Sequence, residues 1–191
     1  MKHSLSDTKE LIKDRRTIKP EDFKPRKVLD DQIKEILNSA RWAPTHGKTE
    51  PWHFIIFQEG ALKELGKFMA KTYENSVSEE DFIQKKYDKL LNRPTLSSVV
   101  VAICMKRQET ERIPEIEEIE AVACSVQNIH LTATAYGLGG YWSSGQVAYS
   151  DAMKSYLNLG EKDRCLGLFY IGYPDIDWPR GRRKTLEHKT E

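Results

Sequence analysis

Continuous apolar stretches alternate along this chain with stretches in which apolar residues recur every three or four positions. The continuous stretches predict strands that are buried on both faces, at residues 53–58, 97–105 and 164–173. The helical spacing predicts helices, at residues 7–15, 30–40, 60–74, 79–91, 114–136 and 150–157. Buried strands between helices indicate a layered α/β or α+β fold. A length of 191 residues suits one domain, residues 1–191.

Local signals refine the ends and faces of these elements. Ser6 or Asp7 can cap the first helix, because Asp7-x-x-Glu10 has the form of a capping box. Gly137 followed by Leu138 is typical of a helix C-cap. The longest predicted helix is expected to turn one apolar face inward, formed by Ile116, Ile119, Ala123, Val126, Ile129 and Ala133. Residues 71–93 are the least apolar stretch between predicted strands, and we expect a mobile excursion there.

The loop of residues 42–52 is the most unusual stretch of the sequence. It holds two prolines and a glycine, and Trp42 and Trp52 stand at its two ends around His46. Proline fixes the backbone angle φ, so the loop is expected to be stiff. Such a loop could cover a flat ligand. It could equally be a connection between a helix and a strand, with both tryptophans in the core.

Composition and charge exclude several classes of protein. Lys and Arg total 30 against 29 Asp and Glu, so net charge does not favour a nucleic-acid or membrane partner. The apolar runs are too short for a transmembrane helix. The three cysteines, Cys104, Cys124 and Cys165, stand in apolar segments without a C-x-x-C motif, which predicts small core residues and a cytoplasmic location. The five histidines lack ligand spacing, so no metal site is expected.

Arg15-Arg16-Thr17, at the predicted end of the first helix, is a candidate phosphate site. Guanidinium groups form bidentate, charge-assisted hydrogen bonds with a phosphate monoester, and a threonine hydroxyl adds another. The alternative is that these arginines only complement the dipole at the end of the helix.

Residues 139–145 form a second candidate, a loop rich in glycine and serine. Gly139 and Gly140 would let the backbone approach a ligand, and Gly145 would permit an unusual φ. Trp142, between them, could instead be a core residue. The spacing does not fit the dinucleotide fingerprint G-x-G-x-x-G, and no P-loop or hydrolase motif is present. The basic tail could complete a phosphate clamp or simply be solvated, and contains Arg180, Arg182, Arg183 and Lys184.

These features, taken in order, resemble the FMN-dependent nitroreductase family, in particular its small, minimal branch. The family shows Arg-Arg-Ser, then A-P-S-x-x-N-x-Q-P-W, then G-x-G-x-x-W after a long helix, and a last core strand of the form F-x-x-G-x-P. The matching segments here are Arg15-Arg16-Thr17, Ala43-Pro44-Thr45 with Pro51-Trp52, Gly137 to Trp142, and Tyr170 to Pro174. This chain departs from the pattern at four positions, where Thr17, Lys48, Glu50 and Ser143 replace Ser, Asn, Gln and Arg.

The resemblance implies an α+β, nitroreductase-like fold with a central mixed sheet flanked by helices. It also implies a homodimer with two FMN sites at the subunit interface. Arg15, Arg16 and Thr17 would hold the phosphate and ribityl end, and Arg183, with Arg182, would close the clamp. Trp142, Ser143 and Ser144 would lie along the flavin ring. Trp42 and His46 would reach the ring from the partner subunit.

The implied activity is hydride transfer from NADH or NADPH through flavin N5, in a ping-pong reaction, to a nitroaromatic, quinone or similar small-molecule acceptor. No catalytic residue of the protein is required, since no carboxylate in the loop motif is close enough in sequence to orient His46 as a base. The alternatives are a specialised member of the family, such as a dehalogenase-like or flavin-processing enzyme, and a flavin-binding or stress-response protein without turnover. A chain without FMN would be a degenerate scaffold.

Overall fold

The central sheet has five strands in the computed structural model, which describes residues 3–187. They are β1 (Phe23–Lys24), β2 (Trp52–Gln58), β3 (Val99–Met105), β4 (Gly139–Ser143) and β5 (Arg164–Pro174). β5 pairs with β1, β3 and β4, and β2 pairs with β3. All these pairs are antiparallel, and in the described residues the parallel contact is one bridge between Thr17 and Gly140. The predicted mixed sheet is therefore wrong, because β5 runs opposite to each of its neighbours.

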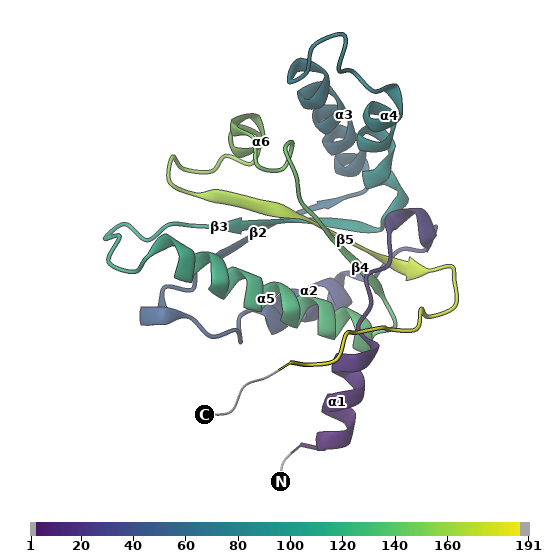
Figure 1. Ribbon diagram of the computed structural model, residues 1–191, viewed down its shortest axis with the longest axis vertical. Coiled ribbons are helices and arrows are strands. Elements are labelled where there is room, and N and C mark those ends of the chain that lie inside the picture. The colour runs from purple at the N-terminus through teal and green to yellow at the C-terminus, as the bar shows by residue number, and fades with distance from the viewer. Residues whose placement is uncertain (1–2, 188–191) are drawn as a thin grey trace.

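Helices cover both faces of the sheet. One face carries α2 (Asp30–Ala40) and α5 (Glu115–Ala135), and the other carries α3 (Gly60–Asn75), α4 (Gln84–Asn92) and α6 (Asp151–Tyr156) (Figure 1). Helix α1 (Leu5–Asp14) lies below the sheet, beside the C-terminal tail. Short 3-10 turns lie at η1 (Pro20–Asp22), η2 (His46–Lys48) and η3 (Arg93–Leu96). None of the described helices could cross a membrane.

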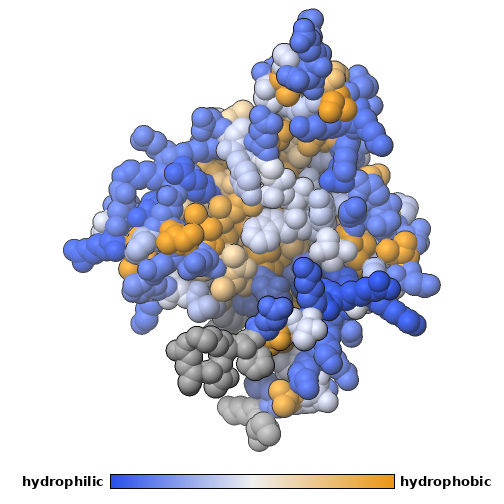
Figure 2. Space-filling view, viewed as in Figure 1, coloured by the Kyte–Doolittle hydropathy of each residue, from blue (hydrophilic) through white to orange (hydrophobic). Residues whose placement is uncertain are grey.

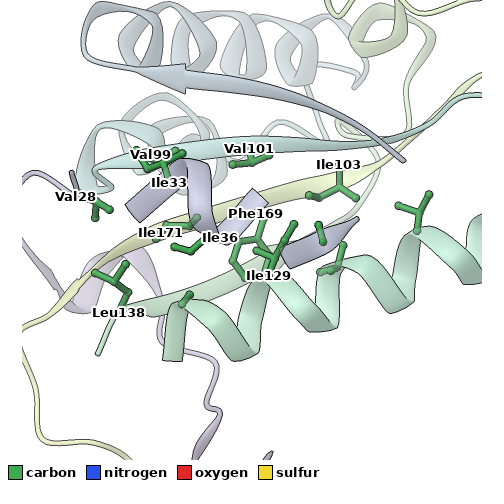
Figure 3. Packing of buried hydrophobic residues seen from close by; sticks show 14 of the residues in the cluster. Val28, Ile33, Ile36, Val99, Val101, Ile103, Ile129, Leu138, Phe169 and Ile171 are labelled. Atoms are coloured by element: carbon green, nitrogen blue, oxygen red, sulfur yellow. The ribbon is translucent and has the colours of Figure 1, made fainter. Parts of the chain in front are cut away.

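Two hydrophobic clusters form the core, one on each face of the sheet. Strand β3 is buried along its whole length and divides its side chains between them. Val99, Val101 and Ile103 point toward α2 and α5, with Phe169, Ile129 and Leu138 packed against them (Figure 3). Val100, Ala102 and Cys104 point toward α3 and α6. This alternation follows from the two-residue period of a strand. The face of the molecule seen in Figure 2 is hydrophilic around its periphery, with apolar patches between the polar side chains.

Several predicted elements are confirmed. The strands at 97–105 and 164–173 and the helices near 30–40, 60–74 and 114–136 are present within about two residues. Gly137 caps α5 with φ +70°, while the Leu138 N–H donates to the Ala133 carbonyl at 2.9 Å. Ser150 caps α6 by accepting a hydrogen bond from the Met153 N–H. Residues 71–93 complete the α3–α4 hairpin, which projects from the body of the molecule (Figure 1).

Other predictions are wrong in instructive ways. Strand β2 is not buried on both faces: it lies at the edge of the sheet, and Ile56 is 43% exposed. The buried face of α5 is rotated, so Ile116 is 58% exposed while Glu118 and His130 are buried. Cys104 and Cys165 are core residues, but Cys124 is exposed on α5. The cap of α1 is Ser4, whose hydroxyl accepts a hydrogen bond from the Asp7 N–H.

Candidate functional site

A pocket of about 310 Å³ lies where the end of α1, the middle of α5 and strand β4 meet. Arg15, Thr17 and Trp142 line this pocket, so the structure brings together three of the residues that the sequence singled out. Helix α5 contributes the rest of the lining, which consists of Ala123, Val126, Gln127 and His130. The pocket therefore joins a cation, a hydroxyl group and an aromatic ring.

The side of the sheet on which Trp142 lies follows from strand alternation. Trp142 is opposite Phe169 on β5, and Phe169 belongs to the core cluster on the α5 side. Its indole lies against Gly167, where a Cβ atom would come within 2.7 Å of the indole Nε1. Gly167 has φ +131°, which favours glycine as well. Trp142 stays 37% exposed, so it is a wall of the pocket rather than a core residue.

Positive charge gathers at this pocket without a carboxylate to neutralise it. Partial burial and the neighbouring charges of Arg183 and Arg16 lower the pKa of Arg15. Within residues 3–187, no salt bridge includes Arg15, Arg16 or Arg183, whereas three other arginines each pair with a glutamate: Arg93, Arg107 and Arg164. Uncompensated guanidinium groups beside a pocket suit an anionic ligand.

Arg16 turns away from the pocket and holds the tail of the chain. Its guanidinium donates to the carbonyls of Pro179 at 2.8 Å, of Arg15 at 2.7 Å and of Lys13. The Trp178 Nε1–H donates to the Asp14 carbonyl at 2.6 Å. We call these contacts between the end of α1 and the tail the tail latch. The latch leads the chain on to Arg182, whose carbonyl accepts from the Arg183 guanidinium at 2.7 Å.

His130 belongs to the site, although nothing in the sequence marked it. Its Nε2 lies 2.8 Å from the Arg16 carbonyl, and its Nδ1 lies 3.4 Å from the Arg15 guanidinium. Burial lowers the pKa of His130 to about 4; the hydrogen bond with the Arg16 carbonyl opposes this, and the charge of Arg15 adds to it. A solitary histidine on a long helix gives no motif, and its partners lie more than a hundred residues away in sequence.

Residues 139–143 of the predicted glycine- and serine-rich loop form strand β4, and this changes two interpretations. Ser143 and Ser144 line a different pocket, of about 240 Å³, together with Met69, Lys86 and Leu90 of the α3–α4 hairpin. Because neighbouring strand residues point to opposite faces, Ser143 does not share the pocket of Trp142. Gly139 and Gly140 make room for protein side chains, not for a ligand: Cβ atoms there would meet Phe23 and Phe169 at 2.6 and 2.7 Å.

The loop of residues 42–52 lies at the other end of α5. Trp42 is 83% exposed, whereas Trp52 packs against the core, so the core alternative holds for only one of the two tryptophans. The His46 Nδ1 lies 2.5 Å from a carboxylate oxygen of Glu117 in the first turn of α5. The expectation concerned only carboxylates within the loop motif, and the carboxylate that orients His46 comes instead from Glu117, 71 positions away.

Two of the departures from the family pattern shape this loop. Lys48 and Glu50 have left-handed backbone angles, φ +55° and +45°, and Gly47 beside them has φ +59°. The Thr45 hydroxyl fixes the strained turn by accepting a hydrogen bond from the Glu50 N–H at 3.2 Å. Such strain persists only where the surroundings impose it, and it concentrates at functional sites.

An antiparallel sheet between two helical layers, with a cationic pocket beside its longest helix, defines an α+β protein of the nitroreductase-like class. A crystal structure of a nitroreductase-like protein from Bacillus cereus matches this chain with a TM-score of 0.81 and 28% identity, over 97% of this chain and 93% of that one. The chain belongs to the nitroreductase family, whose sequence pattern matches residues 12–173.

Sequence relatives agree with this assignment. YdjA of Escherichia coli K12, provisionally named an NAD(P)H nitroreductase, is 28% identical over 146 residues, which cover 76% of this chain and 78% of YdjA. YfhC of Bacillus subtilis 168 has the same provisional name and is 28% identical over 187 residues, 96% of this chain and 92% of YfhC.

Two more distant crystal structures share the fold, each with a TM-score of 0.70. One is a provisionally named nitroreductase from Desulfovibrio desulfuricans in complex with FMN, 20% identical over 95% of this chain and 96% of that one. The other is the FMN-dependent nitroreductase NfnB of Mycobacterium smegmatis in complex with NADPH, 17% identical over 97% and 100%.

Proposed function

We propose that this protein is an FMN-dependent NAD(P)H oxidoreductase that reduces nitroaromatic, quinone or similar small-molecule acceptors. The observation that carries the proposal is the unneutralised arginine cluster at a pocket walled by Trp142, in a chain of the nitroreductase family. The FMN and NADPH complexes of two structural relatives support the choice of cofactor and electron donor.

The residues of the pocket fit FMN. Arg15 would bind the phosphate, since its charge has no carboxylate partner among residues 3–187, and the Thr17 hydroxyl would add a hydrogen bond. Arg16 would act through the tail latch, which carries Arg182 and Arg183 toward the same phosphate. Trp142 would pack against the flavin and would exclude water from that side of the flavin.

Ser143 and Ser144 face the hairpin pocket, so we propose for them a contact at the edge of the flavin or with the acceptor. The chemistry that a bound FMN supplies is hydride exchange at its N5, first with NADH or NADPH and then with the acceptor. The chain itself binds and orients, and its arginines contribute positive potential.

The visible spectrum of the pure protein tests this proposal. A yellow band that bleaches when NADPH or NADH is added under anaerobic conditions is the expected result. A yellow band that never bleaches would instead favour a flavin-binding or stress-response protein without turnover. A colourless protein that takes up no added FMN would leave only a scaffold without cofactor.

A homodimer is the second part of the proposal, because the two candidate regions of one chain lie too far apart to serve one flavin. Glu117, which holds His46, and His130, beside Arg15, are thirteen positions apart on α5. At 1.5 Å per residue they are about 20 Å apart along the helix. Two copies of α5 packed antiparallel about a twofold axis would bring His46 and Trp42 of one subunit to the arginine cluster of the other.

This packing predicts a contact between the two copies of Cys124. The point midway between Glu117 and His130 falls at residues 123 and 124, and Cys124 is exposed there. A short bis-maleimide is expected to link two subunits through Cys124. Cys104 and Cys165 are buried and should not react. An interface of this kind should bury more than about 2,000 Å² in total.

Sedimentation and cross-linking check the homodimer together. The Cys124→Ser variant is the control, and it should remain dimeric while it loses the cross-link. A monomer at micromolar concentration that still binds FMN would contradict the proposal. A dimer that does not cross-link through Cys124 would contradict the packing along α5 alone.

His46 is expected to shape access to the flavin without acting as an acid or base, even though Glu117 orients it. Hydride transfer to N5 needs no proton from the protein. The His46→Gln variant should therefore bind FMN more weakly or change its acceptor preference, while reduction by NADPH stays within roughly tenfold of wild type. Anaerobic stopped-flow bleaching measures this rate, and Glu117→Gln is the matched variant.

The opposite result would be equally specific. Unchanged FMN binding together with reduction slowed more than about a hundredfold, and without its pH dependence, would make His46 catalytic.

A further inference from the structure

The His130 ring is nearly buried at the edge of the pocket and packs against protein on at least two sides. It is 6% exposed and meets the edge of Phe169, with ring centroids 5.2 Å apart and planes at 83°. On another side it touches Gly140, where a Cβ atom would come within 3.0 Å of the ring Nε2. The ring therefore has little freedom to turn, and its two nitrogens have fixed directions.

Those directions select one tautomer. A carbonyl oxygen can only accept, so the Nε2 that lies 2.8 Å from the Arg16 carbonyl must carry the proton. The Nδ1 then has a free lone pair, and it faces the Arg15 guanidinium, which can only donate, at 3.4 Å. Burial favours the neutral ring, with a pKa of about 4, so this arrangement persists at neutral pH.

One imidazole thus contacts both halves of the Arg15-Arg16 pair. It fixes the backbone of Arg16 next to the bridge between Thr17 and Gly140, and it gives the Arg15 side chain an acceptor at the wall of the pocket. A long side chain such as arginine loses much rotamer freedom when it binds a ligand, and a fixed acceptor removes part of that loss beforehand.

We propose that His130 is a positioning residue for the phosphate end of the flavin: it holds Arg15 in the direction from which the guanidinium meets a phosphate. This inference rests on the proposed function, since it assigns His130 to the same FMN site. A positioning residue affects the binding of the phosphate and not of the isoalloxazine ring, whereas a residue that only fills the core would affect both. The two roles of His130 can therefore be told apart by experiment.

The preference for FMN over riboflavin, which lacks the phosphate, is the quantity to measure. Dissociation constants for both flavins are determined with the full-length chain freed of flavin. His130→Leu removes both nitrogens and is expected to lower the preference for FMN about ten- to a hundredfold, with riboflavin binding changed less than about threefold. His130→Asn can place its amide oxygen where the Nδ1 lies, keeps an acceptor for the Arg15 guanidinium, and should recover most of the preference.

His130→Gln and Ser125→Ala complete the set. The glutamine amide nitrogen can take the place of Nε2 and donate to the Arg16 carbonyl, but it leaves no acceptor at the Nδ1 position, so this variant should lose preference as His130→Leu does. Ser125 is buried on the same helix, and its hydroxyl donates to the Val122 carbonyl and to no other group of residues 3–187, so Ser125→Ala should leave the preference unchanged.

The possible failures are distinguishable. Equal weakening of FMN and riboflavin in His130→Leu, or a wild-type preference retained in His130→Gln, would overturn the inference and leave the proposed function standing. A wild-type chain that binds neither flavin would overturn the proposed function, and the inference with it.

Discussion

Replacing Arg15 by alanine is expected to weaken FMN binding about ten- to a hundredfold, because one charge-assisted contact with a phosphate contributes roughly 1.5–3 kcal/mol. Arg15 is the guanidinium that lines the pocket, and Arg183 and Arg16 add to the positive potential around it. Equilibrium titration with FMN measures the change. Riboflavin should bind the variant and the wild type about equally, since it lacks the phosphate.

Arg16→Ala separates the direct role from the indirect one. Arg16 contacts the tail and not the pocket, so its loss should free the tail and weaken FMN binding less than the loss of Arg15. Arg41→Ala removes an exposed arginine whose guanidinium, within the described part of the chain, bonds only the Asn38 side chain, and it serves as the control for net charge. If Arg15→Ala and Arg16→Ala both hold FMN as tightly as the wild type, the phosphate assignment is wrong.

A second large effect is expected on stability, at the buried ion pair between Arg107 and Glu118. The Glu118 side chain is 1% exposed and the Arg107 side chain 10%, and the Gln108 amide also donates to Glu118, at 3.3 Å. Arg107→Met would leave a buried carboxylate without its cation. The free energy of unfolding should therefore fall by about 3–5 kcal/mol, measured by urea denaturation.

The matched control is the exposed pair of Arg164 and Glu115, whose side chains are 50% and 40% exposed. Solvent screens this pair, so Arg164→Met should lower the unfolding free energy by less than about 1 kcal/mol. The double variant Arg107→Met, Glu118→Met should recover much of the loss, because it removes both buried charges. Arg107→Met within about 1 kcal/mol of wild type would contradict the prediction.

The same pair explains why the sequence predicted the position of α5 but not its orientation. The apolar spacing locates the helix within one residue at each end, yet the buried face includes Glu118, Ser125 and His130. A prediction from helical periodicity assigns polar side chains to the exposed face of a helix. Glu118 can be buried because it forms an ion pair with Arg107, and His130 because its ring bonds the Arg16 carbonyl. A local sequence pattern does not reveal these partners.

Strand β4 was missed for a related reason. Gly139 and Gly140 are poor strand formers alone, and they fit here because Phe23, Phe169 and other side chains fill the space beside them. With β4 taken as a loop, the alternation of its side chains could not be applied, so Trp142 and Ser143 were expected on one surface. Arg15, Thr17 and Trp142, in contrast, were found through motifs, and the fold brings them to one pocket.

The tail latch has a consequence for how such proteins are compared. Arg16 and Trp178 supply its donors, and backbone carbonyls supply the acceptors, at Lys13, Asp14, Arg15 and Pro179. Every residue type has a backbone carbonyl, so the tail latch requires particular side chains only at its two donors, Arg16 and Trp178. The side chains at the acceptor positions are free to vary. Its tail residues, Trp178 and Pro179, lie beyond residue 173, where the family's sequence match ends. A family match that stops at residue 173 therefore leaves out the residues by which the chain fastens its last segment to its first helix.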